Sequence, residues 1–228
     1  MGIKIYYDGS DRIEDYLDVV DGVTTNIGFL KKSGITDYSS FIEDTIKINE
    51  GGKRISFQVF SDTVTGMREQ ALKISSFSPD VFVKIPVVSP DGLSTTELVN
   101  ELVFDKQLNI NVTCVYTKEQ IDSLGFLANS ESPVIVSIFC GRIADTGNDA
   151  LDIAHYAVSK FKDNPNVEIL WAGCQRVYDI LAAERIGCHI ITVPEGVLKK
   201  RERIGMGLDT FSIKTSYDFH MDGKGLYL

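Results

Sequence analysis

The chain has 228 residues, 43% of them hydrophobic and 24% charged, which is ordinary for one globular domain with a single large core. Its formal net charge of −9 argues against a nucleic-acid partner, because a phosphate backbone is bound by a basic surface. A sugar phosphate remains compatible, since it needs only a few local donors. No run approaches the roughly 20 apolar residues of a membrane span, and the first residues contain no apolar signal stretch.

The cysteines indicate a compartment. Cys114, Cys140, Cys174 and Cys188 show no CxxC spacing, and three of them lie in or beside apolar runs. This pattern predicts buried free thiols in a reducing environment, and therefore a cytoplasmic protein. The histidines at positions 155, 189 and 220 are scattered along the chain, so we expect no metal site.

Short β-rich runs alternate with longer helical ones along the chain. The predicted strands span 3–8, 22–26, 55–60, 81–86, 110–116, 133–139, 167–173 and 188–194. Several of them are continuously apolar, as parallel strands covered on both faces are. The predicted helices span 12–20, which is long enough for about two turns, and 39–48, 63–77, 95–105, 118–128, 149–161 and 175–187.

This alternation predicts a fold of the α/β class, a single (β/α)8 TIM barrel that forms one domain over residues 1–228. An open doubly wound sheet alternates in the same way, but no GxGxxG motif follows the first strand to support it. The segment after Phe211 is polar and contains glycine. We therefore expect an irregular C-terminal tail from about residue 212, ordered in part by an oligomer contact.

The predicted carboxyl ends of the strands, where a barrel of this class carries its chemistry, hold mostly polar residues. Buried polar groups are costly unless they face a shared, hydrogen-bonded cavity, so we expect these side chains to line one site. In chain order the residues are Asp8, Asn26, Gln58, Lys84, Thr113, Ser137 with the nearby Arg142, Gly173 and Thr192.

Lys84 lies within the apolar run VFVKIPVV. Burial favours the neutral amine, which is the nucleophile that attacks a ketone to give an iminium. The alternative is a structural lysine paired inside the barrel with an acid such as Asp8. Asp8 itself is either a general acid/base acting on a substrate hydroxyl or the N-cap of a helix that starts near Asp11.

The neutral and cationic residues at the strand ends also have two interpretations. Asn26 and Gln58 either orient substrate hydroxyls or a water, or they satisfy the backbone of their loops. Arg142 follows the sixth strand, where a guanidinium can hold a phosphate or a carboxylate. Its alternative is a salt bridge with Asp145.

Taken together and in order, several segments resemble successive signatures of the transaldolase family, including its small branch with the fructose-6-phosphate aldolases. They are GVTTN (Gly22–Asn26), VKIP (Val83–Pro86), NVT (Asn111–Thr113), GRIADTGND (Gly141–Asp149) and HIITVPEGVL (His189–Leu198). The similarity runs from Ile3 to about Lys200, which is most of the chain.

The resemblance implies reversible aldol cleavage of a sugar or sugar phosphate. Lys84 would form the Schiff base, and Asp8 would deprotonate the hydroxyl beside the cleaved bond. Asn26 and Ser137 would bind the ketose end, with Phe139 and Arg142 beside the substrate, while Thr113 and Gln58 would handle the water. The iminium accepts the electrons, so the reaction implies no metal and no organic cofactor. Small members of the family assemble as homo-oligomers, and their setting is carbohydrate metabolism, including the pentose phosphate pathway.

Three positions depart from the family pattern. Gln58 is glutamine as in the aldolases, where transaldolases have glutamate. Phe139 is phenylalanine as in transaldolases, where the aldolases have a tyrosine that helps activate the hydrolytic water. After the seventh strand, Gly173 and Gln175 replace the serine and arginine that usually hold the sugar phosphate, which makes a substrate poor in phosphate a live hypothesis.

Three functions follow as hypotheses. The first is a lysine-dependent transaldolase that transfers a dihydroxyacetone unit to an aldehyde acceptor. The second is an aldolase that releases dihydroxyacetone. The third, motivated by Gln58, Gly173 and Gln175, is a catalytically silent barrel that binds a sugar or a partner. A deoxyribose-phosphate-type aldolase is disfavoured, because that group uses a second lysine near the nucleophile.

Overall fold

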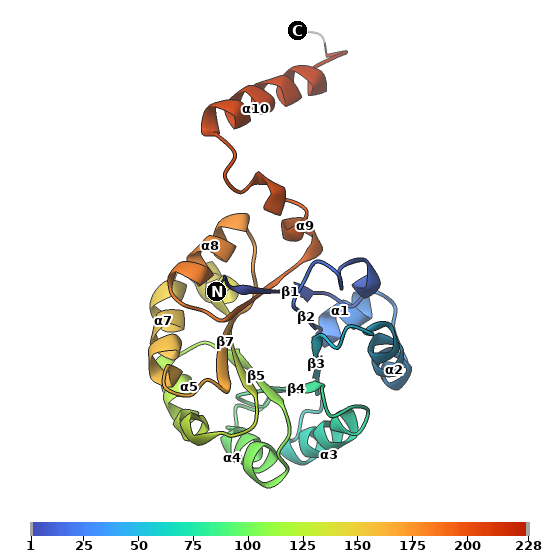
Figure 1. Cartoon of the computed structure of the whole chain (residues 1–228), viewed down its shortest axis with the longest axis vertical. Helices are drawn as coiled ribbons and strands as arrows, with labels where there is room; N and C mark the ends of the chain where they lie inside the picture. The colour runs from blue at the N-terminus through green and yellow to red at the C-terminus, as the bar shows by residue number, and fades with distance from the viewer. Residues whose placement is uncertain (1, 227–228) are drawn as a thin grey trace.

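The computed structural model describes residues 2–226, and it contains a closed barrel of eight parallel strands (Figure 1). Each strand pairs with the next along the chain, and the last pairs with the first. The strands are β1 (Lys4–Asp8), β2 (Gly22–Thr24), β3 (Arg54–Gln58), β4 (Phe82–Pro86), β5 (Ile110–Val115), β6 (Val134–Ile138), β7 (Val167–Trp171) and β8 (Ile190–Val193). The predicted (β/α)8 barrel is therefore confirmed.

Helices surround the barrel and connect its strands (Figure 1). They are α1 (Ile27–Lys32), α2 (Tyr38–Ile48), α3 (Val64–Ser75), α4 (Thr96–Asn100), α5 (Lys118–Ser123), α6 (Cys140–Asp145), α7 (Ala150–Phe161), α8 (Val177–Arg185), α9 (Glu195–Leu198) and α10 (Leu208–Asp222). Short 3-10 turns lie at Ile13–Asp15, Gly125–Asn129 and Arg201–Arg203, and a π-helical turn at Glu101–Asp105 extends α4.

The first connection is less helical than predicted. Where the sequence predicts about two turns over residues 12–20, the structure has one 3-10 turn at Ile13–Asp15. Arg12 precedes this turn with φ 53°, in the left-handed region, and provides no side-chain cap. Without a cap the free amide groups of a first turn are unsatisfied, which shortens the helix.

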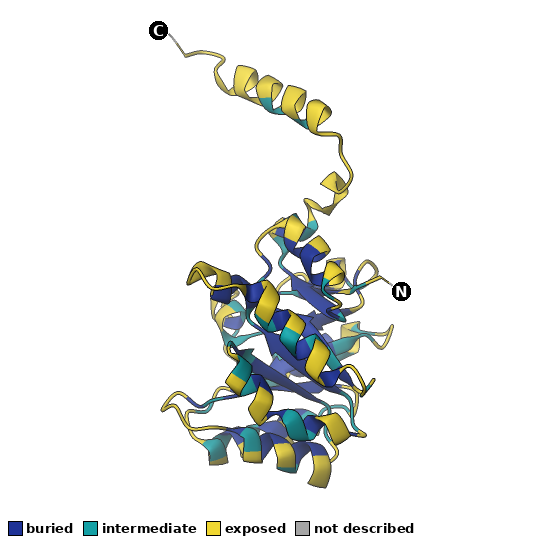
Figure 2. Ribbon diagram, turned by 90° about the vertical axis from the view of Figure 1, so that its left-hand side faces the viewer, coloured by how far each residue is buried: buried dark blue, intermediate teal, exposed yellow. Residues whose placement is uncertain are grey.

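The C-terminal segment corrects a second prediction. Residues from about 212 were expected to be irregular, yet α10 is a helix that covers Leu208–Asp222. No glycine or proline interrupts this stretch, since the glycines of the tail lie at its end and beyond, at positions 223 and 225. Lys214 and Asp218, one turn apart, form an ion pair at 2.7 Å that supports the helix. Figure 2 shows α10 standing away from the barrel with its surface exposed.

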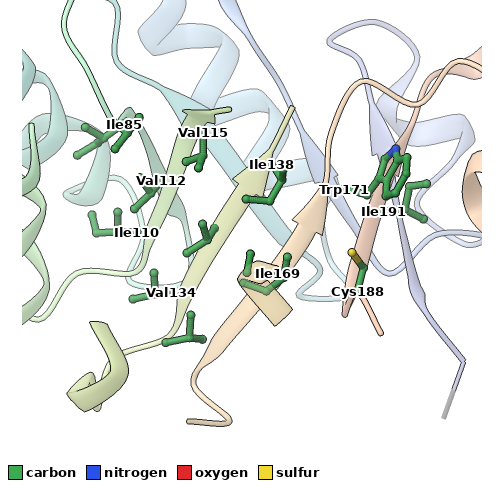
Figure 3. Packing of buried hydrophobic residues seen from close by; sticks show 14 of the residues in the cluster. Ile85, Ile110, Val112, Val115, Val134, Ile138, Ile169, Trp171, Cys188 and Ile191 are labelled. Atoms are coloured by element: carbon green, nitrogen blue, oxygen red, sulfur yellow. The ribbon is translucent and has the colours of Figure 1, made fainter. Parts of the chain in front are cut away.

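Two packed clusters divide the apolar residues of the strands. The larger one lies between the outer faces of the strands and the surrounding helices, and includes Ile85, Val112 and Ile169 (Figure 3). The smaller one fills the barrel interior with Tyr6, Phe82, Ile135, Leu170, Ala172 and Ile190, with Phe139 packed against it. Since strand side chains alternate between two faces, the inward positions left for polar residues lie at the carboxyl ends. Among residues 2–226, no helix is long and apolar enough to cross a membrane.

Candidate active site

Lys84 lies on β4 and its side chain is buried, with 5% of its surface exposed. Its amine donates to the backbone carbonyl of Thr25 at 3.3 Å. Burial lowers the pKa of Lys84 below that of an ordinary lysine, against the opposing charges of Asp8 and Cys114, and the cation of Arg142 lowers it further. The lysine is therefore neutral more readily than a surface lysine, as nucleophilic attack on a carbonyl requires.

Asp8 is the last residue of β1 and faces the same interior. Its carboxylate accepts a hydrogen bond from the Thr24 hydroxyl at 2.9 Å, and the Thr24 and Thr192 hydroxyls lie 2.5 Å apart. Burial raises the pKa of Asp8, while the charge of Lys84 and the bond from Thr24 oppose the rise. Asp8 and Lys84 are thus electrostatically coupled without forming a direct ion pair in the described part of the chain.

The cap predicted as an alternative role for Asp8 does not occur. The turn that follows β1 is preceded by Arg12, not by Asp8, and no side chain caps it. The structural alternative for Lys84, a direct pair with Asp8, is likewise not what the described residues show.

Gln58 and Thr113 lie on the strands beside Lys84. Gln58 ends β3 and pairs in register with Lys84, and it is the backbone carbonyl of Gln58, not its amide, that accepts the Tyr38 hydroxyl at 3.0 Å. Thr113 lies on β5, and its buried hydroxyl has no hydrogen-bond partner within residues 2–226. A buried hydroxyl without a protein partner is a natural place for a bound water or a substrate oxygen.

Ser137 donates from β6 to the Asn111 amide oxygen at 2.7 Å, and the Asn111 amide donates to the Ser56 hydroxyl at 3.0 Å. These buried hydrogen bonds link β6, β5 and β3 beneath the mouth of the barrel. The prediction from the strand ends did not include Ser56 and Asn111. Each lies two residues before a predicted site residue, Gln58 or Thr113, and alternate residues of a strand face the same side, so the sequence spacing could have indicated both.

Asn26 serves the backbone in this structure. Its side chain accepts from the Phe29 amide at 3.1 Å and caps α1. This is the loop-satisfying interpretation of Asn26, and the bond occupies the amide oxygen only.

Phe139 and Arg142 form one edge of the mouth. The Phe139 ring stacks on Tyr116 with centroids 5.5 Å apart, and the Arg142 guanidinium lies 5.5 Å from the Phe139 centroid. The salt bridge with Asp145 that was the alternative role of Arg142 is not formed. Instead, the Gln175 amide donates to both Asp145 carboxylate oxygens, at 3.3 and 3.2 Å.

Position 141, in the first turn of α6, must be glycine because the loop after β7 packs against it. A Cβ atom added at Gly141 would lie 1.9 Å from the carbonyl oxygen of Gly173, so no side chain fits at this position. Gly173 has φ 74°, in the left-handed region that glycine favours. The close approach of these two backbones fixes Arg142 and Gln175 on neighbouring segments.

The fold and the site together define a class of protein: a (β/α)8 barrel with a buried lysine and a coupled carboxylic acid at the carboxyl ends of its strands. A neutral amine beside an acid of raised pKa is suited to imine formation and proton transfer.

Comparison with known proteins identifies the family. Residues 6–219 match the model of the Transaldolase/Fructose-6-phosphate aldolase family, so the chain belongs to this family. A probable transaldolase of Thermoplasma volcanium is 31% identical over 219 residues, covering 92% of this chain and 93% of the relative. Probable transaldolases of Thermoanaerobacter sp. and Nitrosopumilus maritimus are 31% identical over 188 residues and 29% over 204, covering 82% and 87% of this chain and 82% and 86% of those relatives.

Proposed function

We propose that this protein is a transaldolase-type enzyme that forms a Schiff base through Lys84 and transfers a dihydroxyacetone unit between sugars. The observation that carries the proposal is a buried lysine, Lys84 on β4, with the carboxylic acid Asp8 at the end of β1 inside the same barrel; burial lowers the pKa of Lys84 and raises that of Asp8. These are the two groups that a cofactor-free aldol cleavage needs, a neutral amine and an acid that can hold a proton.

The chemistry begins at Lys84. Its neutral amine adds to the ketone carbon of the ketose, and loss of water from the carbinolamine gives the iminium. Asp8 takes the proton from the hydroxyl two carbons away, the adjacent carbon–carbon bond breaks, and its electron pair moves into the iminium. An aldehyde leaves, and a three-carbon enamine remains on Lys84. The acceptor aldehyde is attacked by this enamine, its oxygen receives the proton from Asp8, and hydrolysis of the new iminium frees the product.

The assay that tests this function mixes a ketose donor with an aldehyde acceptor and follows the new ketose by mass spectrometry. The proposal expects a product lengthened by three carbons relative to the acceptor. Free dihydroxyacetone without a transfer product would instead favour the aldolase that releases this unit. Neither product with any donor that forms an imine would favour the silent sugar-binding barrel.

The residues beside Lys84 favour transfer of the three-carbon unit to an acceptor over its release by hydrolysis. Gln58 is an amide and cannot act as a base, and Phe139 has no hydroxyl to polarise a water near Thr113, whose hydroxyl has no partner within residues 2–226. We therefore expect hydrolysis of the enzyme-bound three-carbon unit to be slow, which leaves time for an acceptor to bind.

Phe139→Tyr should raise the ratio of released dihydroxyacetone to transferred unit by about tenfold, because a hydroxyl beside the water strengthens its activation. Both products are measured in one reaction at a fixed acceptor concentration. Tyr116→Phe, which changes the ring stacked on Phe139 without adding a hydroxyl, serves as the control. An unchanged ratio in Phe139→Tyr would discredit this explanation of the water step.

We also propose that the protein is a homo-oligomer held by α10. The exposed apolar residues of this helix lie on two opposite faces: Leu208 and Phe219 on one, and Ile213, Tyr217 and Met221 on the other. Leu208 is 85% exposed and Ile213 and Phe219 are each 72% exposed, so the barrel of the same chain covers none of them. The family match extends to residue 219, so most of α10 is a family element and a second copy is the partner we expect.

Ile213→Asp should lower the mass measured by light scattering, because a charge in an apolar interface is desolvated without a partner. Ser216→Asp is the matched control, since it adds the same charge to the side of the helix between the two apolar faces. Loss of assembly in both variants, or in neither, would contradict the role of the apolar faces.

We also propose a cytoplasmic location, which is supported by the four free cysteines.

A further inference from the structure

Two buried threonine hydroxyls connect in series to the carboxylate of Asp8. The Thr24 hydroxyl donates to Asp8 Oδ1 at 2.9 Å, and the Thr192 hydroxyl lies 2.5 Å from the Thr24 hydroxyl. Both threonines are buried, and they come from β2 and β8, the two strands that pair with β1. Both neighbours of the strand that carries Asp8 therefore contribute to holding one carboxylate oxygen.

The direction of these hydrogen bonds follows from the number of protons. Each threonine hydroxyl has one proton to donate and two lone pairs that accept. An ionised Asp8 only accepts, so the Thr24 proton points to Oδ1 and Thr192 donates to Thr24. A hydroxyl that accepts a hydrogen bond is polarised and donates more strongly. Thr192 therefore strengthens the bond to the ionised carboxylate through Thr24.

This series leaves the second carboxylate oxygen for the reaction. Asp8 Oδ2 accepts no hydrogen bond from any group of residues 2–226. The ionisable groups in that range whose charges are coupled to Asp8 are Lys84 on β4 and Cys174 in the loop after β7. Neither of them donates a hydrogen bond to Asp8 there, so the bond from Thr24 orients the carboxylate.

We infer that Thr192 is a positioning residue for the aldol cleavage: through Thr24 it holds Asp8 Oδ1 in place and leaves Oδ2 to take the proton of the substrate hydroxyl. The inference rests on the proposed function, because Asp8 has this proton to take only when a ketose is bound to Lys84. A carboxylate held at one oxygen meets the substrate in one orientation, and loss of orientation slows such a proton transfer without weakening substrate binding.

The experiment uses the full chain and compares Thr192→Val, which exchanges the hydroxyl for a methyl group, with Thr192→Ser, which keeps the hydroxyl. Release of the aldehyde from D-fructose 6-phosphate and from D-fructose measures cleavage, and borohydride trapping of dihydroxyacetone measures imine formation. Thr192→Val should lower kcat about tenfold, with KM within about twofold of wild type and the trapped adduct unchanged. Thr192→Ser should keep the wild-type kcat.

The pH profile distinguishes positioning from a general loss of packing. Burial raises the pKa of Asp8, while the charge of Lys84 and the bond from Thr24 oppose the rise. Weakening that bond in Thr192→Val raises this pKa further, so the acidic limb of kcat should move up by about half a pH unit. Thr45→Val is the matched control. It removes a buried hydroxyl that donates to the Phe41 carbonyl at 2.7 Å on α2, and the limb should not move.

A double variant tests whether Thr192 acts through Thr24. Thr24→Val should lower kcat by more than Thr192→Val does, and adding Thr192→Val to it should change neither kcat nor the acidic limb any further. Additive losses would overturn the inference, as would a wild-type kcat and limb in Thr192→Val. Loss of the adduct in Thr192→Val would overturn it as well, by showing a general disturbance of the site. A wild-type protein that forms no adduct, or cleaves neither ketose, would count against the proposed function instead.

Discussion

Lys84→Met is expected to abolish turnover while leaving the barrel folded and slightly more stable. Loss of a catalytic nucleophile costs on the order of 10⁶-fold in rate, and methionine has no amine to form an imine. Methionine fills the same buried space without a group that burial penalises. Steady-state transfer and borohydride trapping measure the first effect, and thermal unfolding measures the second.

The stability effect has a definite sign with pH. Burial lowers the pKa of Lys84 in the folded chain relative to its ordinary value of 10.5. The folded state therefore binds this proton less readily than the unfolded state, which costs stability at low and neutral pH. The cost disappears as the pH rises toward 10.5. Lys84→Met should accordingly raise the Tm by about 2–4 °C at neutral pH, and by less in alkali.

An exposed lysine provides the comparison for this variant. Lys106→Met removes the same charge from the surface and should change neither turnover nor Tm measurably. Substantial residual turnover in Lys84→Met would remove the Schiff-base mechanism. A Tm lowered by several degrees would show that the buried amine stabilises the barrel, which contradicts the expected cost of its burial.

Asp8→Asn is expected to block bond cleavage but not imine formation. Removal of a general acid/base costs about 10²–10⁴-fold in rate, while the amine of Lys84 remains. The carboxylate of Asp8 raises the pKa of Lys84, so its loss should lower that pKa and shift trapping with dihydroxyacetone toward lower pH. Cleavage rates and the pH dependence of the trapped adduct measure both effects.

The control for this variant is Asp11→Asn, an exposed residue in the loop that follows β1. It should leave cleavage and trapping unchanged. If the Lys84 adduct disappeared in Asp8→Asn together with cleavage, Asp8 would have to act on imine formation, and the assignment of the proton transfer to Asp8 would be wrong.

The strands could be predicted closely from the sequence because their signal is local. Apolar runs, each with one polar residue, define β4 and β6. Each of the eight observed strands ends within two residues of its predicted end. The short α1 and α6 were not predicted. Each spans six residues, too few to show a helical period in the sequence, and α6 begins at a glycine contact that only the folded chain reveals.

The sequence predicted which residues at the strand ends form the candidate site, but it did not predict the hydrogen bonds between them. The apolar surroundings of Lys84 indicated its burial directly. The hydrogen bonds from Ser137 to Asn111, and from Thr24 to Asp8, depend on the register between neighbouring strands, which the pattern of apolar residues does not fix. The capping role of Asn26 was one of two open interpretations, since capping and ligand binding use the same amide. The engagement of Gln175 with Asp145 joins the loop after β7 to α6, and no sequence spacing indicates it.

The most direct test of the central claim is borohydride reduction of the wild-type protein in the presence of dihydroxyacetone, followed by intact mass and peptide mapping. Imine formation at Lys84 predicts a single adduct of the size of reduced dihydroxyacetone, carried by the peptide that contains Lys84. An adduct at another lysine, or no adduct at saturating dihydroxyacetone, would contradict the Schiff-base mechanism.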